Sequence, residues 1–329
     1  MENNEIRTLA FDLTRNSVKD HTISEASDVL RQALNDLAGG ESISMKSLRR
    51  HKPEYFDLIE ELIPVIIHEN DLNDEFFRRM VEERNVAEGD KTEFVVPSKS
   101  LFVVSEMANG IATPRRQRIG ESRKVTIPTT NHGIRIYEEF DRFRAGRIDW
   151  PELVSRVAKS YRNKRFEDIY AVLSGISADT QGLSSEYVYA GTYSEEEVLK
   201  VCDHVEADTG KAPVIFGTRP ALRKCTSAVI ADEAKSAYYN GGYYGKLAGV
   251  DMVYIPNQHK GNTNEFVFPD NKIWIFASDE RPIKYVTEGD AWILEKTEGN
   301  ADMTIEYTML LKYGIGMVVN QKFGMCTFA

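Results

Sequence analysis

The stretch MTIEYTMLLKYGIGMVVNQKFGMCTFA (303–329) decides how this chain folds. Apolar and β-branched residues dominate it, and Gly314, Gly316 and Gly324 punctuate it. A terminal segment without structure is usually polar, whereas this one has the composition of strands. We therefore predict a long terminal strand, or a pair of strands, that the fold requires.

The residues before this stretch predict a mixed α/β arrangement. A further strand is expected in GDAWILEKTEG (289–299), which turn residues bound on both sides. Upstream, SEEEVLKVCDHVEADTG (194–210) has acidic residues in its first turn and a terminal glycine, as helices do. The short apolar runs APVIFGT (212–218) and VDMVYIPN (250–257) predict strands.

The strongest predicted helix begins in DWPEL (149–153). Asp149 can cap it, Glu152 follows three residues later as in a capping box, and Pro151 suits the first turn. Gly175 is expected to end it. The helix would hold about 25 residues and span roughly 37 Å, which suits a structural spine.

Residues 93–139 have the order strand, basic tip, strand, which predicts an extended two-stranded ribbon. An isolated ribbon is only marginally stable in water. We therefore expect another surface to cover it, either in this chain or in a neighbouring copy. The first 90 residues contain amphipathic helical patterns at 22–40, 53–67 and 73–84, but these are thinly apolar.

Charge is unevenly distributed along a chain whose net charge is −10. Residues 54–90 hold twelve acidic residues and three arginines, a local charge of −9. Residues 110–124 carry a local charge of +4. These are either two solvated surfaces or an acidic and a basic element that meet, within one chain or between copies. So acidic a chain is a poor candidate for wrapping nucleic acid with its whole surface.

No familiar catalytic or cofactor motif occurs in the sequence. Gly314 and Gly316 resemble a fragment of a dinucleotide fingerprint, but they lie in a predicted strand and are interpreted as packing glycines. Cys202 and His204 would diverge by about 200° on a helix, so a shared metal is not expected. We predict no catalytic residues, no cofactor and no metal site. The three cysteines are expected to be free thiols.

Membrane segments and a secretory signal are also not expected, because no apolar run is long enough. Four tyrosines lie close together around Gly241 and Gly242. Aromatic rings among glycines can stack on bases, but the nearby basic residues are few, chiefly Lys235 and Lys246. We interpret this tyrosine cluster as packing or as a contact between subunits.

Taken in order, these pieces resemble a major capsid protein of tailed bacteriophages. This family has the capsid fold of phage HK-ninety-seven, which encapsulins share. GDKTEFVVPSKSLFVVSEMANG (89–110), RRQRIG (115–120) and IYEEFDRFRAGRIDWPELV (136–154) look like the extended loop leading into the spine helix. GTRPALRKC (217–225) and LAGVDMVYIPN (247–257) look like the axial domain, and YTMLLKYGIGMVVNQKFG (307–324) looks like the closing strands.

The resemblance implies an α+β fold with five parts. These are an N-terminal helical arm (1–90), an extended β-hairpin loop (91–137), a peripheral domain with the spine helix (138–190), an axial α/β domain (191–287) and the closing strands of the peripheral domain (288–329). In the family, the loop lies across a neighbouring subunit, which would cover its exposed edges.

The resemblance also implies a function. We expect a structural protein, not an enzyme, that self-assembles into pentamers and hexamers of an icosahedral virion shell around double-stranded DNA. Expected partners are further copies of the chain, a separate scaffolding protein, a portal protein and weakly, non-specifically held DNA. Assembly would take place in the host cytoplasm. The alternatives are an encapsulin-like cargo shell and a soluble α/β enzyme.

Opposite charges on two segments suggest where copies meet. We expect the basic loop to contact acidic residues of an adjacent copy, with the candidate residues being Arg115, Arg116, Arg118, Arg123, Glu82, Glu83 and Glu88. Some family members crosslink a lysine to an asparagine of a neighbour. Lys99 and Lys124 lie on the predicted loop, but the sequence supplies no matching acceptor or catalytic acid.

Overall fold

The computed structural model describes residues 74–97, 116–118, 120–139, 150–175, 183–225, 241–261, 263–296, 304–319 and 321–329, together with positions 8 and 32. The chain divides into two compact units. The first unit comprises Met1–Asp74, Thr129–Glu167 and Thr287–Tyr313, and the second comprises Glu75–Pro128, Asp168–Val286 and Gly314–Ala329. The helices predicted at 22–40 and 53–67 lie outside the described residues, as do Asp149, Arg115 and Lys99.

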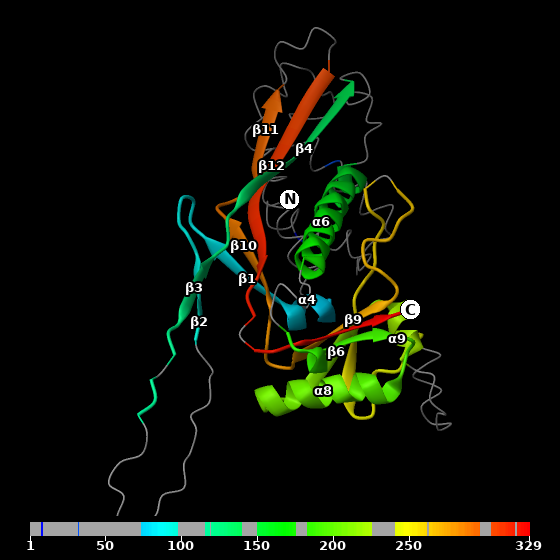
Figure 1. Cartoon of the computed structure of the whole chain (residues 1–329). Coiled ribbons are helices and arrows are strands. Elements are labelled where there is room, and N and C mark those ends of the chain that lie inside the picture. Colours follow the sequence, from blue (N-terminus) through cyan, green and yellow to red (C-terminus); the bar gives the residue numbers. More distant parts are fainter. Residues whose placement is uncertain are drawn as a thin grey trace, which may run out of the picture. The chain divides into compact units, whose positions relative to one another are not determined.

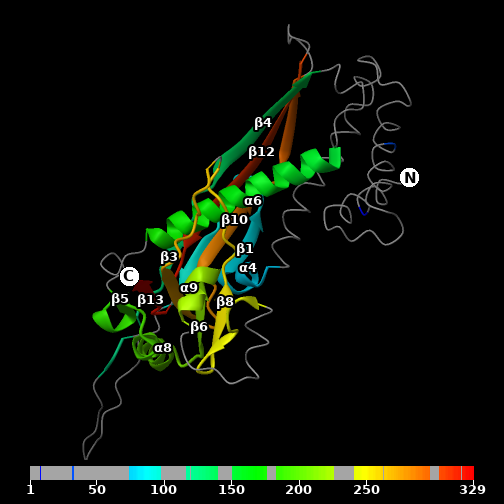
Figure 2. The ribbon, with the colours of Figure 1, turned by 90° about the vertical axis from the view of Figure 1, so that its right-hand side faces the viewer.

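The first part of the terminal stretch forms the central strand of the sheet in the first unit. Strand β12 (Thr304–Met317) lies between β4 (Thr130–Glu139) and β11 (Trp292–Lys296), and both neighbours are antiparallel to it. Leu310 of β12 is opposite Gly133 of β4 and Trp292 of β11. The three strands run side by side in both ribbon views (Figures 1 and 2). The predicted long terminal strand and the strand predicted within 289–299 are both confirmed.

The helix predicted to begin in 149–153 is α6 (Trp150–Ser174), which has 25 residues. It ends at the residue before Gly175, whose amide donates to the carbonyl of Ala171 at 3.0 Å. Within the first unit, Val157, Ala158, Tyr161 and Phe166 are buried at helical spacing. The predicted position and length of the helix are confirmed.

The second unit is built on a mixed six-stranded sheet of order β5-β13-β9-β6-β8-β7. Its strands are β5 (Val188–Gly191), β6 (Pro213–Gly217), β7 (Lys246–Leu247), β8 (Val250–Tyr254), β9 (Lys272–Ala277) and β13 (Gly324–Phe328). β13 pairs parallel with β5 and antiparallel with β9. The expected closing segment 288–329 is therefore divided, with β12 and β13 in different sheets.

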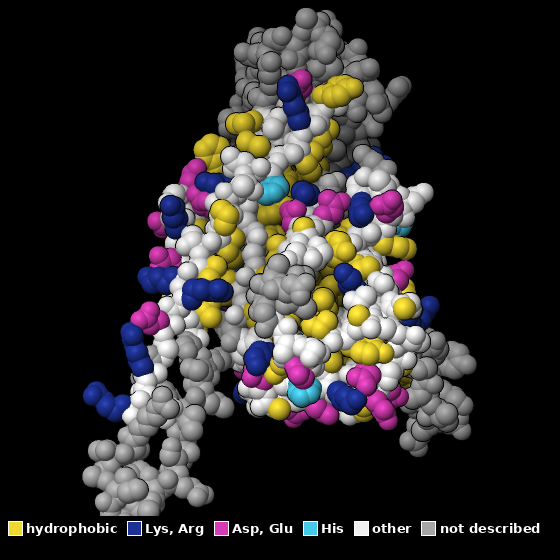
Figure 3. All heavy atoms as spheres, in the orientation of Figure 1, with side chains coloured by type: hydrophobic (Ala, Val, Ile, Leu, Met, Phe, Trp, Pro, Cys, Tyr) yellow, Lys and Arg dark blue, Asp and Glu magenta, His cyan; other side chains and the backbone are white. Residues whose placement is uncertain are grey.

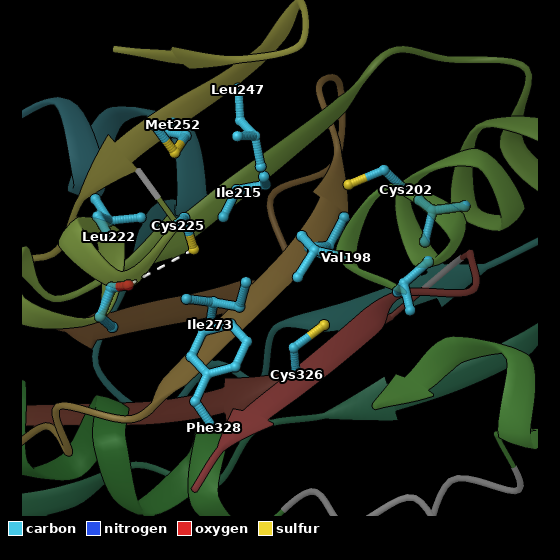
Figure 4. Packing of buried hydrophobic residues seen from close by; sticks show 14 of the residues in the cluster. Val198, Cys202, Ile215, Leu222, Cys225, Leu247, Met252, Ile273, Cys326 and Phe328 are labelled. Carbon is cyan, nitrogen blue, oxygen red and sulfur yellow. Dashed lines mark hydrogen bonds between the residues drawn. The ribbon is translucent and has the colours of Figure 1, made fainter. Parts of the chain in front are cut away.

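Both faces of this sheet are buried. Successive side chains of a strand point to opposite faces, so neighbouring residues of β9 lie on different faces of the sheet. In β9, Ile273 and Ile275 belong to a core that helix α8 (Glu195–Thr209) also enters through Val198 and Val201 (Figure 4). Trp274 and Phe276 alternate with these isoleucines and contact other aromatic rings, Phe268 and Phe323 respectively. From Ile273 to Ala277, strand β9 is therefore apolar and buried on both of its sides.

The segment 73–84 differs from the prediction of one helix. Helix α4 (Glu75–Met80) is only six residues long, and strand β1 (Val81–Val86) follows directly. β1 pairs with β10 (Ile283–Glu288), so tertiary pairing overrides the local helical pattern. The remaining elements are β2 (Glu93–Val96), β3 (Arg123–Thr126), the short helix η1 (Ser185–Tyr187) and helix α9 (Arg219–Lys224).

Candidate assembly surfaces

At the base of the predicted ribbon, β2 and β3 pair as expected, and the two faces of this pair differ. The second part of the predicted ribbon, residues 130–139, is instead strand β4 and pairs with β12. β2 and β3 pair antiparallel, with Phe94 opposite Val125 and Val95 opposite Lys124. Phe94 is 3% exposed and packs in a small core with Ile127, while Val95, on the opposite face, is 56% exposed. This chain therefore covers one face of the ribbon and leaves an exposed apolar residue on the other.

The acidic candidates lie on β1 and in the turn after it. Glu82 is bound by Lys284, which is 8% exposed in its side chain, and by Arg84 at 2.6 Å. Partial burial raises the pKa of the Glu82 carboxyl, but hydrogen bonds from Lys284 and Arg84 outweigh this effect and lower the pKa. Glu83 and Glu88 are exposed. Glu82 thus has a structural role within its own chain, whereas Glu83 and Glu88 present carboxylates at the surface.

The basic candidates in the described part of the ribbon are exposed. Arg118 pairs with Glu121 at 2.5 Å, and both side chains are largely in solvent. Arg116 and Arg123 have no ion pair with any described residue. Lys124 pairs with Glu93 across the ribbon at 2.6 Å, and this hydrogen bond raises the pKa of Lys124. The structure does not bring the basic and acidic candidates together within the described residues.

The outer face of the sheet in the first unit carries a second apolar surface. Trp292 and Leu294 on β11 are 52% and 51% exposed and point the same way because they are two residues apart. Tyr137 on β4 is also exposed. An ion pair between Arg135 and Glu306 borders these residues. On the side of the molecule in Figure 3, charged side chains of both signs surround scattered apolar ones.

The two glycines of the terminal strand are packing residues, as predicted. A Cβ added to Gly314 would lie 2.2 Å from the carbonyl oxygen of Pro128, and one added to Gly316 would lie 3.0 Å from Ile127. Real Cβ atoms essentially never approach to 2.2 Å, and 3.0 Å is tighter than nine in ten of their contacts. Both glycines therefore allow the segment 127–128 to lie directly against β12.

The three cysteines are buried, free thiols in the core of the second unit. Burial raises the pKa of Cys202 and Cys225 to about 12, and it also raises that of Cys326. Thiols protonated in this way are poor nucleophiles and poor ligands. Among the described residues, no group of His, Cys, Asp or Glu is arranged to hold a metal ion. No helix in the described part has the length and apolarity to span a membrane.

Basic residues that lie far from the tyrosine cluster in sequence contact it in the fold. The guanidinium of Arg219 lies 4.8 Å from the ring centre of Tyr254, which in turn is 6.3 Å from the ring of Tyr243. Nε of Arg223 donates to the carbonyl of Gly242 at 3.0 Å. The sequence interpretation missed this arrangement because it looked only for basic residues adjacent in sequence.

A family model described as "SPbeta prophage-derived putative capsid protein YonB" matches residues 5–327. No curated protein sequence matches the chain.

The chain also resembles solved capsid structures of low sequence identity. The acid-stable capsid of Helicobacter pylori bacteriophage KHP30 matches with a TM-score of 0.54 and 10% identity, over 78% of this chain and 91% of that one. The capsid of cyanophage Pam1 matches with a TM-score of 0.52 and 9% identity, over 78% and 92%. A chain from Microbacterium phage Oxtober96 gives 0.50 and 13%, over 78% and 91%. At such low identity these likenesses establish the fold alone.

Proposed function

Because the chain belongs to the family of the prophage-derived capsid protein YonB, we propose that it is a major capsid protein that self-assembles into the icosahedral shell of a tailed phage. Its role is structural and not catalytic. The observation that carries this proposal is the family match over residues 5–327, together with a phage-capsid fold. Pentamers and hexamers would form from repeated contacts between copies, and the shell would enclose double-stranded DNA.

In this proposal, the chain consists of the five parts that the sequence predicts. Residues 1–90 form an arm, 91–137 an extended loop, 138–190 a peripheral domain built on α6, 191–287 an axial domain, and 288–329 the closing strands. Support for the loop comes from the β2–β3 ribbon, whose exposed Val95 would be covered by a neighbouring copy. A separate scaffolding protein and a portal protein would act during assembly in the host cytoplasm, and the product would be the virion.

Contacts between copies would include the basic loop and the acidic segment. Arg115, Arg116, Arg118 and Arg123 would meet the carboxylates of an adjacent copy near Glu82, Glu83 and Glu88. The engagement of Glu82 by Lys284 within the chain makes Glu88 the stronger acceptor. Exposed ion pairs contribute only about 0–1 kcal/mol each, so they would set the register between copies and not supply the main stability.

Purification of the full-length chain, followed by negative-stain electron microscopy and nucleic-acid analysis of any particles, tests this function. Uniform closed shells are expected. DNA inside shells from infected or induced cells supports a phage capsid, whereas packaged protein without DNA supports the encapsulin-like alternative. A chain that stays a monomer or dimer under all conditions contradicts both.

A further inference from the structure

The base of the β2–β3 ribbon is anchored to its own chain through the ring of Phe94. This residue lies on β2 and is buried in a small core with Ile127 and Val286. The guanidinium carbon of Arg84 lies over the ring, 4.3 Å from its centre, and Nζ of Lys284 lies 5.7 Å from the same centre. Both distances are within the range of about 6 Å at which the face of an aromatic ring attracts a cation. The ribbon thus supplies one ring to this core, and strands β1 and β10 supply two cations.

A single carboxylate holds both cations in this position. Glu82 and Arg84 are two residues apart on β1, so their side chains lie on the same face of the strand. Oε1 of Glu82 accepts from Nε of Arg84 at 2.8 Å, and Oε2 accepts from Nζ of Lys284. Lys284 also donates to the carbonyl of Arg281 at 2.7 Å. Because each cation already has a fixed acceptor, holding it over the ring of Phe94 costs little further side-chain entropy.

The second strand of the ribbon is anchored at a different point. Strand β3 ends at Thr126, and the next residue, Ile127, is buried in the same core as Phe94. Pro128 then lies so close to Gly314 that a Cβ added to this glycine would be 2.2 Å from the proline carbonyl oxygen. A ribbon that is held at both of its strands cannot swing about either one. The direction in which it leaves the second unit is therefore set at its base.

We propose that Glu82, Arg84, Phe94 and Lys284, here called the Phe94 clamp, position the ribbon in the free subunit, before any neighbouring copy is bound. This inference rests on the proposed function, because only an assembly gives the ribbon a neighbour to cross. The three charged residues are positioning residues, which act on the ribbon through Phe94. Val95 follows Phe94 in β2, points to the opposite face and is 56% exposed. By holding Phe94 inward, the clamp therefore turns Val95 towards the surface that a neighbour would cover.

Orientation of the ribbon before assembly changes the energetics of assembly. A ribbon that moved freely would lose conformational entropy when a neighbour bound it, and this loss would weaken the contact. In the clamped ribbon, folding has already restricted the base. The clamp also resists salt, because the side chain of Lys284 is only 8% exposed and salt screens buried charges weakly. The exposed pair of Arg118 and Glu121, farther along the ribbon, is screened much more strongly.

Hydrogen exchange of the full-length chain, kept below the concentration at which it assembles and measured by mass spectrometry, tests the proposal. F94L keeps an apolar side chain but removes the ring, R84M removes a cation, and F94L/R84M combines them. In each single variant, amide exchange in β2 and β3 should rise by between about 2-fold and about 30-fold, the range that a cation–π contact accounts for. Amides of β6 and β9 should exchange as in the wild type. F266L is the matched control, because it makes the same substitution at an exposed phenylalanine of the second unit.

The double variant decides whether the ring and the guanidinium act together. Because both substitutions remove the same contact, R84M should raise exchange less in the F94L chain than in the wild type, and this result supports the clamp. Independent effects of the two substitutions, unchanged exchange, or an equal rise throughout the second unit would overturn it. Electron microscopy at assembly concentrations tests the proposed function separately. A wild type that forms no shells contradicts that function, whatever the exchange of the free chain shows.

Discussion

The hydroxyl of Tyr161 on helix α6 donates to two backbone carbonyls on neighbouring strands, Met309 of β12 at 3.0 Å and His132 of β4 at 3.3 Å. One side chain therefore links helix α6 to the central strand and to an edge strand of the sheet in the first unit. Burial raises the pKa of Tyr161 to about 12, so the hydroxyl stays protonated and able to donate.

Replacing this tyrosine tests the link between helix and sheet. Y161F keeps the ring but removes the donor, and leaving two carbonyls without it should lower the free energy of unfolding by about 1–3 kcal/mol. Urea unfolding of the full-length chain measures the change. The wild type should also lose stability as pH rises from 10 towards 12, because only the unfolded tyrosine ionises in that range. A variant as stable as the wild type would show that these hydrogen bonds contribute nothing.

Gly314 is expected to tolerate no side chain. In G314A the new Cβ would be forced against the carbonyl of Pro128, a backbone atom that has little freedom to move. We expect a loss of about 3 kcal/mol or more, or failure to fold. G245A is the matched control, because no described atom lies within 4 Å of its added Cβ. Equal thermal midpoints for the two variants would contradict the packing argument.

The pair of Glu82 and Lys284 should make the second unit sensitive to acid. The pKa of Glu82 is lowered from 4.5 on folding, so the pair's stabilisation is fully present above pH 4.5 and is lost as pH falls through the folded pKa. K284M removes the partner of a partly buried carboxylate and should lower the free energy of unfolding by about 1–3 kcal/mol at neutral pH.

The double variant E82Q/K284M provides the control for this pair. It removes both charges, so it should recover part of the stability and lose the acid dependence below pH 4.5. Unfolding midpoints measured from neutral pH to pH 3 report both effects. An acid dependence that persists unchanged in the double variant would assign it to other groups.

The main architecture could be predicted from the sequence because it depends on patterns local to each element. The apolar run at 303–329 and the capped start near Asp149 identify β12 and α6 directly. Pairing across the fold is not local. The segment 73–84 has a helical pattern, but the helix ends at Met80 because β1 pairs with β10. No pattern within residues 81–86 predicts this pairing.

The same distinction between local patterns and distant contacts applies to the candidate surfaces. The opposite charge blocks indicated that Arg116, Arg123 and Glu88 are surface residues. No local pattern indicates that Lys284 neutralises Glu82, because the two residues are 202 positions apart in the chain. The contact between helix α9 and the turn at Gly242 was missed for the same reason. Arg223 reaches Gly242 only because α9 folds against the turn, and a search for arginines at helical spacing near aromatic–glycine clusters would have found it.

Charge reversal tests the contact between copies. R116E/R123E should reduce the yield of shells in the presence of moderate salt, because it places like charges opposite the acidic segment of the neighbour. Adding E83K/E88K should restore part of the yield by returning opposite charges to the contact. Sedimentation of assembled particles gives the yields. Restoration is the informative outcome, since loss alone can follow from misfolding, and its absence would argue against this pairing.

The terminal strands should be required for folding. Truncation at Lys312 removes Tyr313–Ala329, which contain the end of β12 and all of β13. β5 and β9 would then each lose a hydrogen-bonded neighbour, so we expect insoluble protein and no particles. Removal of Ala329 alone, which is exposed, is the control. Normal particles from the longer truncation would contradict the assignment of these strands to the folding core.

Cryo-electron microscopy of particles assembled from the full-length chain tests the central claim most directly. We predict closed icosahedral shells built of pentamers and hexamers, in which the loop 91–137 of each copy lies across a neighbouring copy and that neighbour covers Val95. Discrete soluble monomers or dimers, or shells in which Val95 and the ribbon face open solvent in every copy, would contradict the account.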